Sequence, residues 1–128
     1  MTITHINPAT MHKNPYFSQA VLVEGGRTLY IGEQNGVDDA GAIVPGGAKA
    51  QALAALDQVK RILTDVGADQ SNVVRLTVYF SKDTTLDPIF EASNESWGDF
   101  PTPITVLQVH ALGRPDALVG IEAVAVLP

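Results

Sequence analysis

The stretch Phe100-Pro-Thr-Pro-Ile-Thr-Val-Leu-Gln-Val-His110 is followed closely by Val119-Gly-Ile-Glu-Ala-Val-Ala-Val126. Both stretches are rich in the β-branched residues that favour strands. The segment between them contains Leu112-Gly-Arg-Pro-Asp116, whose glycine and proline are typical of a turn. The pattern predicts two strands here, from about Ile104 to His110 and from Leu118 to Leu127.

Upstream of these strands, two segments carry helical signals. Residues 48–66 place apolar side chains three or four positions apart, and Gly67 can end a helix in the left-handed conformation. Asp87-Pro88 predicts a second helix, with a capping carboxylate and a proline at the first helical position. That helix should end at Gly98 and carry Phe90 and Trp97 on one stripe. The stripe of the first helix comprises Ala48, Ala52, Leu56, Val59 and Leu63.

Three further segments read as strands. Ser18–Val23 and Thr28–Ile31 flank Gly25-Gly26, which predicts a hairpin. Residues 72–80 alternate in polarity, with Arg75, Thr77 and Tyr79 opposite an apolar set. The order β-β-(β)-α-β-α-β-β predicts an α+β fold in which two helices cover one face of a mixed sheet. The apolar set of the alternating strand is Val74, Leu76, Val78 and Phe80.

The composition predicts one domain that associates with copies of itself. A chain of 128 residues corresponds to a single domain, which we take to span residues 1–128. Charged residues make up 17% of the chain, below the about 25% of an average soluble domain. A sheet face that carries arginine, threonine and tyrosine is too mixed for a core. We therefore expect other subunits to cover part of that surface.

Charge and residue usage argue against several classes of partner. The net charge is −6 and the eight Lys and Arg residues are scattered, so we expect no nucleic-acid binding. No apolar run approaches the about 18 residues that span a membrane. The N-terminal residues lack the basic start and apolar core of a signal peptide, so we expect a cytoplasmic protein. Cysteine is absent and His5, His12 and His110 have no metal-ligand spacing, so neither a metal nor another cofactor is expected.

The two C-terminal stretches resemble the last third of the Rid family, the YjgF-like reactive intermediate deaminases, and the resemblance covers nearly the whole chain. In that family a strand opening Pro-Ala-Arg-Ser/Thr precedes a final strand of the type Val-Glu-Ile-Glu-Ala-Ile-Ala-Val. The resemblance implies a chorismate-mutase-like fold and a homotrimer whose sheets form a central barrel. It also implies clefts between subunits that bind a small molecule. This chain is identified as a divergent member, outside the RidA subgroup.

The divergence lies at the family's functional positions. Pro103 stands at the arginine position, Gly120 at the first glutamate position and Gly32 at the position of a family serine. The family tyrosine corresponds to Phe17 if the alignment is anchored on Ser18-Gln19-Ala20, and to Tyr16 if it is anchored on Pro15. The ligand cleft that the resemblance implies is formed by Tyr16, Phe17, Gly32, Glu33, Pro103, Thr105 and Gly120.

The resemblance also implies what these replacements remove. In the family the arginine clamps a substrate carboxylate, and the glutamate positions or activates the water that attacks an imine carbon. A charge-assisted contact contributes roughly 1.5–3 kcal/mol, and general acid–base help about 10²–10⁴-fold in rate. From Pro103 and Gly120 we therefore expect no useful hydrolysis of 2-iminobutyrate.

Several residues are candidates to replace the lost groups. Glu33, Glu122 and Tyr16 are the catalytic candidates. Strand alternation leaves Glu33 equally able to face the cleft or the opposite side. Glu122 lies one pleat repeat, about 6.6–6.8 Å, from position 120, and we expect it to be structural. Among the cations, we expect Arg75 to serve a subunit interface and Arg114 to lie in a turn.

Two functions remain open from the sequence. The first is a Rid-type hydrolase that acts on an enamine, imine or related metabolite without a carboxylate clamp. The second is a non-catalytic or regulatory trimer that binds a small ligand in its clefts. The ribonuclease activity attached by name to some relatives fits poorly with the negative charge balance.

Overall fold

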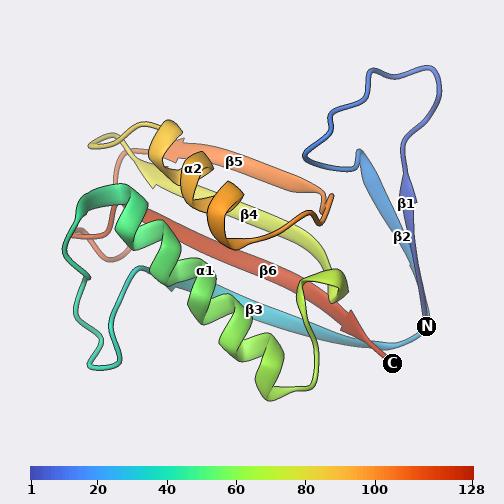
Figure 1. Cartoon of the computed structure of the whole chain (residues 1–128), viewed down its shortest axis with the longest axis horizontal. Coiled ribbons are helices and arrows are strands. Elements are labelled where there is room, and N and C mark those ends of the chain that lie inside the picture. Colours follow the sequence, from blue (N-terminus) through green and yellow to red (C-terminus); the bar gives the residue numbers. More distant parts are fainter.

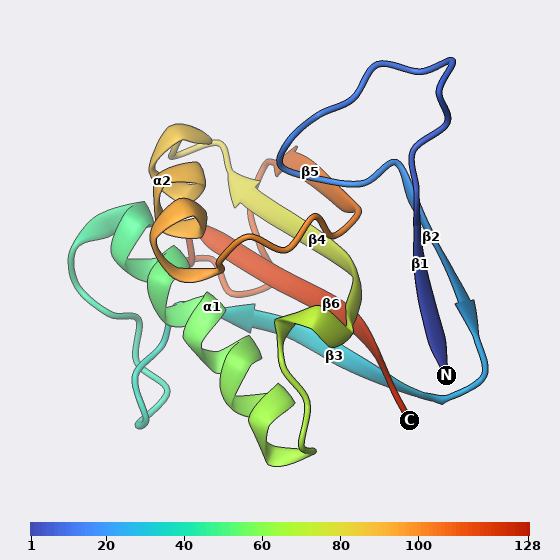
Figure 2. The same ribbon diagram turned by 45° about the vertical axis from the view of Figure 1, so that its right-hand side comes forward.

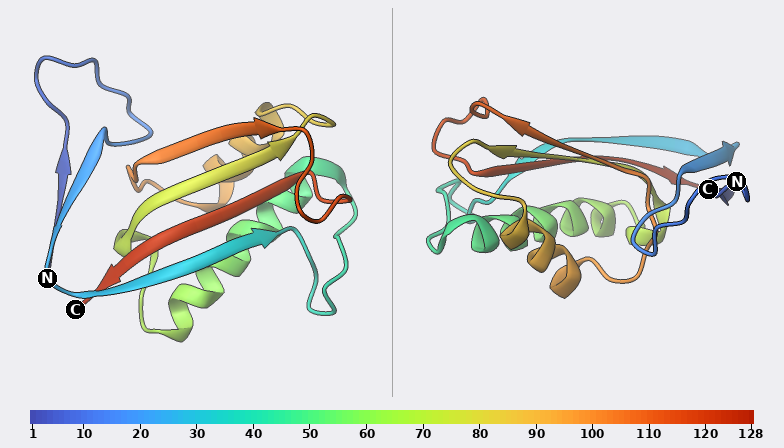
Figure 3. Two further views of the ribbon diagram at one scale, coloured as in Figure 1. Left: turned by 180° about the vertical axis from the view of Figure 1, so that it is seen from behind. Right: turned by 90° about the horizontal axis from the view of Figure 1, so that it is seen from above.

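The computed structural model describes residues 1–128 and places the helices on one face of a four-stranded sheet (Figure 1). The sheet has the order β3 (Arg27–Asn35), β6 (Val119–Leu127), β4 (Val73–Ser81) and β5 (Ile104–Val109). β4 and β5 are parallel, whereas β6 is antiparallel to both of its neighbours. Seen from above, both helices lie on the same side of this sheet, which confirms the predicted α+β arrangement (Figure 3).

Helix α1 (Gly47–Asp65) packs its predicted apolar stripe onto the sheet. Ala52, Val59 and Leu63 are fully buried, so the helical periodicity read from the sequence is confirmed. The helix ends before Gly67, whose φ of 76° provides the left-handed residue that the sequence predicted. A single turn of 3-10 helix, η1 (Gln70–Asn72), then leads into β4.

Helix α2 (Asp87–Ser96) differs from the prediction in two details. Asp87 is the first helical residue and not the cap: Leu86 takes the cap position and makes no side-chain hydrogen bond. Phe90 and Trp97 do not share a buried stripe, because Phe90 is 43% exposed whereas Trp97 is 4% exposed. The buried residues inside the helix are Ile89 and Ala92. Phe90 instead contacts the ring of Tyr16 in the N-terminal segment.

The N-terminal strands stand apart from the main sheet. β1 (Thr2–Ile6) and β2 (Ala20–Glu24) form an antiparallel pair that projects beyond the sheet (Figures 1 and 2). Gly25 and Gly26 do form a turn, with φ values of 71° and 88°. The predicted hairpin is nevertheless wrong, because β2 pairs with β1 and β3 pairs with β6. The glycines specify the turn but not the direction in which the strands leave it.

The sheet face without helices is called the open face below. On β4 it carries Arg75, Thr77 and Tyr79, as the alternation predicted, whereas Leu76 and Val78 join the core. A register shift lies between residues 73 and 75 of β4, so Val73 and not Val74 enters the core. The structure contains no helix long and apolar enough to cross a membrane. Other residues on the open face are Tyr30, Thr105, Leu107, Gly120, Glu122 and Val124.

Candidate functional site

The side chain of Glu33 lies over the backbone of Gly120. The pairing of β3 with β6 shifts register between Ile31 and Gln34, and this irregularity turns Glu33 toward the open face. A Cβ atom built on Gly120 would lie 2.0 Å from Oε1 of Glu33, 2.5 Å from Cδ and 2.7 Å from Cγ. Position 120 therefore has no room for a side chain while Glu33 keeps this conformation.

Glu33 belongs to a small group of acidic and phenolic side chains. Tyr79 Oη donates a hydrogen bond of 2.7 Å to Oε1 of Glu122. Across the β4–β6 ladder, Gly120 is the partner of Tyr79 and Glu122 is the partner of Thr77. The structure thus brings Glu33 of β3 next to Gly120 and Glu122 of β6.

The electrostatics of this group favour protonated forms. Partial burial raises the pKa of Glu33 above its ordinary value, and the negative charge of Glu122 raises it further. The hydrogen bond to Glu122 raises the pKa of Tyr79, and partial desolvation and the charges of Glu122 and Glu33 act in the same direction. A raised pKa makes the Glu33 carboxylate a stronger base toward a water proton than an ordinary carboxylate.

Arg75 borders two hollows on the open face. One has a volume of about 390 Å³ and is lined by Gly32, Thr77 and Glu122, among others. The other has a volume of about 410 Å³ and includes Phe17, Pro103 and Thr105. Of the seven residues of the predicted cleft, Gly32 lines the first hollow, and Phe17, Pro103 and Thr105 line the second. The sequence had assigned Arg75 to an interface, and only the structure shows that it borders both hollows.

Tyr16 lies away from this group. Its ring packs edge-on against Phe90 of α2, with ring centroids 5.2 Å apart. It lines an apolar cavity of about 290 Å³ between α2, β5 and the segment around residue 16. Within one chain, the structure does not bring Tyr16 to Glu33. Phe17 borders both this cavity and the hollow that contains Pro103.

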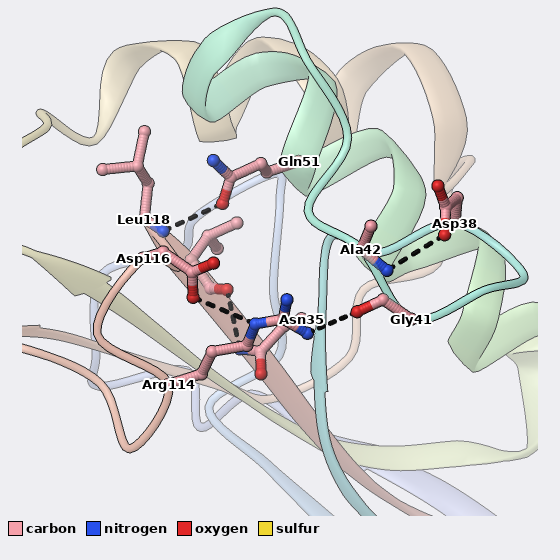
Figure 4. A network of polar contacts seen from close by, with 9 residues as sticks. Asn35, Asp38, Gly41, Ala42, Gln51, Arg114, Asp116 and Leu118 are labelled. Atoms are coloured by element: carbon pink, nitrogen blue, oxygen red, sulfur yellow. Dashed lines mark hydrogen bonds and ion pairs between the residues drawn. The ribbon is translucent and has the colours of Figure 1, made fainter.

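Arg114 is held within its loop (Figure 4). Its Nε atom donates to Oδ1 of Asp116 at 3.0 Å, and its Nη1 atom donates to the carbonyl of Gly41 at 2.6 Å. These bonds join the loop before β6 to the loop after β3. No group of three or more His, Cys, Asp or Glu side chains is arranged to hold a metal ion.

Comparison with known proteins places this arrangement in a family. Residues 8–127 match the family model described as endoribonuclease L-PSP. The chain belongs to this family, which is also called the Rid or YjgF family.

Sequence and structural relatives support the same assignment. A bovine protein named 2-iminobutanoate/2-iminopropanoate deaminase is 40% identical over 114 residues, covering 86% of this chain and 79% of the relative. The crystal structure of a Rid family protein of unknown function from Yersinia pestis is 33% identical, with a TM-score of 0.87, and 99% and 100% of the two chains are covered. A putative endoribonuclease from Thermotoga maritima is 27% identical, with a TM-score of 0.73 and coverage of 88% and 87%. These structures share the fold of two helices on a mixed sheet.

Proposed function

We propose that this protein binds a small metabolite on the open face of its sheet, in clefts between three copies of the chain, and hydrolyses an imine or enamine there. The observation that carries the proposal is the carboxyl of Glu33, which occupies the side-chain space of Gly120 and has a raised pKa. The proposal departs from the expectation, based on Pro103 and Gly120, that 2-iminobutyrate is not usefully hydrolysed. A carboxyl stands in the side-chain space of position 120, but it comes from another strand.

The chemistry needs one group that moves protons. Glu33 takes a proton from water as the water oxygen bonds to the imine carbon, and the electron pair of the C=N bond moves to nitrogen. The proton then passes to nitrogen. Loss of ammonia with the hydroxyl proton leaves the carbonyl product, so the net reaction is imine plus water to carbonyl plus ammonia. General acid–base catalysis of this kind contributes about 10²–10⁴-fold in rate.

The deaminase name belongs to the relatives, and the proposal uses it only as support for the reaction class. Pro103 favours a second function, because proline offers neither a side-chain donor nor a backbone N–H to a ligand. The alternative is a trimer that binds a small ligand without converting it. In that case Glu33 and Glu122 would serve recognition alone.

The test is imine decay with and without the protein. 2-Iminobutyrate is generated in place by a threonine dehydratase, and its disappearance is followed for the wild type and for Glu33→Gln. We expect the wild type to accelerate decay and the variant to lose about 10²–10⁴-fold of the acceleration. The matched control is Glu24→Gln on β2, which removes an equal charge far from the open face. Equal rates for wild type and Glu33→Gln would refute the role of Glu33, and no acceleration by the wild type would favour the non-catalytic alternative.

A further inference from the structure

We infer that Arg75 is the anion anchor of this site and that it selects ligands that carry a carboxylate. The inference rests on the proposed function and deepens it by naming the charge of the ligand. It also changes the role of Arg75, which the sequence suggested for a subunit interface.

Arg75 stands directly beside Pro103. β4 and β5 run parallel, with Leu76 paired to Ile104 and Thr77 paired to Thr105. The N–H of Leu76 donates to the carbonyl of Pro103 at 3.0 Å. The guanidinium of Arg75 therefore leaves the sheet one strand away from Pro103, on the same face as Thr105. The positive charge of Arg75 thus lies next to Pro103, which has no hydrogen-bond donor of its own.

The guanidinium of Arg75 has no partner within the chain, unlike the other three arginines. Arg27 donates to the carbonyl of Pro128 at 2.9 Å, and Arg61 forms an ion pair with Asp39 at 3.0 Å. Arg114 donates to Asp116 in its own loop and to the carbonyl of Gly41 in the loop after β3. A guanidinium has five N–H donors whose planar fork matches a carboxylate. In a chain of net charge −6, an unpaired cation in a hollow is the place where an anion can be held.

The spacing of Arg75 and Glu33 suits a short ligand. Their strands, β4 and β3, are separated by β6 alone. Arg75 is paired with Val124, four positions along β6 from Gly120, which corresponds to about 13 Å. The long side chain of Arg75 covers part of this distance. A ligand of a few carbon atoms, with a carboxylate at one end, can span what remains to the carboxyl of Glu33.

Tyr79 lies on the same face of β4 as Arg75, and its hydroxyl donates a hydrogen bond to Glu122. The positive charge of Arg75 lowers the pKa of Tyr79, whereas the negative charge of Glu33 raises it, and the larger upward effect comes from the bond to Glu122. The charges of Arg75 and Glu33 therefore both act on this hydroxyl, in opposite directions.

The test compares two stable probes that differ only in charge. 2-Oxobutyrate and 2-oxobutyramide carry a carbonyl in place of the reactive imine, so their binding is measured by calorimetry without turnover. We expect the wild type to prefer the acid, and Arg75→Gln to lose about 10–150-fold of acid affinity with little change for the amide. Arg61→Gln is the matched control, because it removes an equal charge from α1 on the opposite side of the sheet.

Moving the arginine from β4 to β5 tests whether its position on the sheet, rather than residue 75 itself, is what matters. In the double variant Arg75→Gln and Pro103→Arg, the guanidinium is offered from β5, and the backbone bond to residue 103 is kept because it uses only the carbonyl. We expect this variant to recover most of the preference for the acid. Recovery would show that the cation, and not the identity of residue 75, is what the ligand needs.

Three outcomes would overturn the inference: equal affinity of the wild type for acid and amide, an unchanged preference in Arg75→Gln, or dissociation of the assembly by Arg75→Gln in sedimentation. The last would return Arg75 to an interface role. The failure of the proposed hydrolysis gives a different pattern. In that case Arg75-dependent binding of 2-oxobutyrate persists, while imine decay is not accelerated and does not depend on Glu33.

Discussion

We expect Glu33 to destabilise the folded protein at neutral pH, because partial burial raises the pKa of its carboxyl. Its pKa in the folded chain is raised above 4.5, so the folded state binds its proton more tightly than the unfolded state does. Stability is therefore lost as the pH rises from the unfolded pKa through the folded one. We expect Glu33→Gln to have a higher Tm than the wild type at pH 7 and a smaller advantage at pH 4. Thermal unfolding at both pH values checks this, and a constant difference would contradict it.

We expect Gly120→Ala to leave the stability of the fold nearly unchanged but to displace the side chain of Glu33. The three atoms nearest to a new Cβ belong to the side chain of Glu33, which can swing away, and Gly120 has no positive φ. Gly120→Ala should therefore change the free energy of unfolding by less than about 1 kcal/mol. It should also lower the pKa of Glu33, which NMR titration of the carboxyl would show. An unchanged pKa would mean that Glu33 does not depend on the open space at position 120.

An exchange of the two residues sharpens this test. Gly120→Glu alone places two carboxylates in one space, whereas the double variant Glu33→Gly and Gly120→Glu returns a single carboxyl to it. We expect the single variant to lose stability at pH 7 and the double variant to regain it. Urea unfolding of both variants at pH 7 measures the difference. If the double variant is as unstable as the single one, the clash between the two positions is not the cause.

At the scale of elements, the residue that follows β3, Gly36, packs directly against the backbone of α1. A Cβ on Gly36 would lie 2.3 Å from Cα of Gln51 and 2.4 Å from its carbonyl oxygen, which are helix backbone atoms. Gln51 is itself fixed, since its Oε1 accepts a hydrogen bond of 2.9 Å from the N–H of Leu118 (Figure 4). We expect Gly36→Ala to cost about 1–3 kcal/mol in urea unfolding. Gly32→Ala on β3, where nothing lies within 4 Å of the new Cβ, should be nearly neutral and serves as the control.

Sequence patterns predicted the elements better than their contacts. The stripe of α1 and the alternation of β4 report burial on one side, and the structure confirms both. The pairing of β2 was predicted wrongly, because its partner β1 lies far from it in the chain and the glycine turn shows only local geometry. The sequence named Glu33 as a candidate for the site but left the direction of its side chain open, for a similar reason. Simple alternation cannot foresee the register shift that turns it toward Gly120.

At the scale of the whole molecule, the fold can be predicted from the sequence of one chain, whereas the assembly depends on contacts between chains. The fold follows from order and periodicity, and its match to Rid structures confirms it. The assembly depends on how the open face is covered. That face leaves Tyr30 78% exposed and Leu107 41% exposed, and no helix of the same chain reaches it. Apolar side chains exposed on both edge strands of an uncovered sheet face favour an interface with another protein surface.

We therefore expect a homotrimer joined through the open face. Sedimentation of the wild type should give about three times the 13.6 kDa mass of one chain. Leu107→Asp places a charge at the proposed interface, where it has no partner, and should shift the protein toward smaller species at micromolar concentration. Leu86→Asp is a matched control, since Leu86 is 40% exposed but lies at the start of α2 on the helical side. A monomeric wild type, or equal effects of the two substitutions, would show that the open face does not join the subunits.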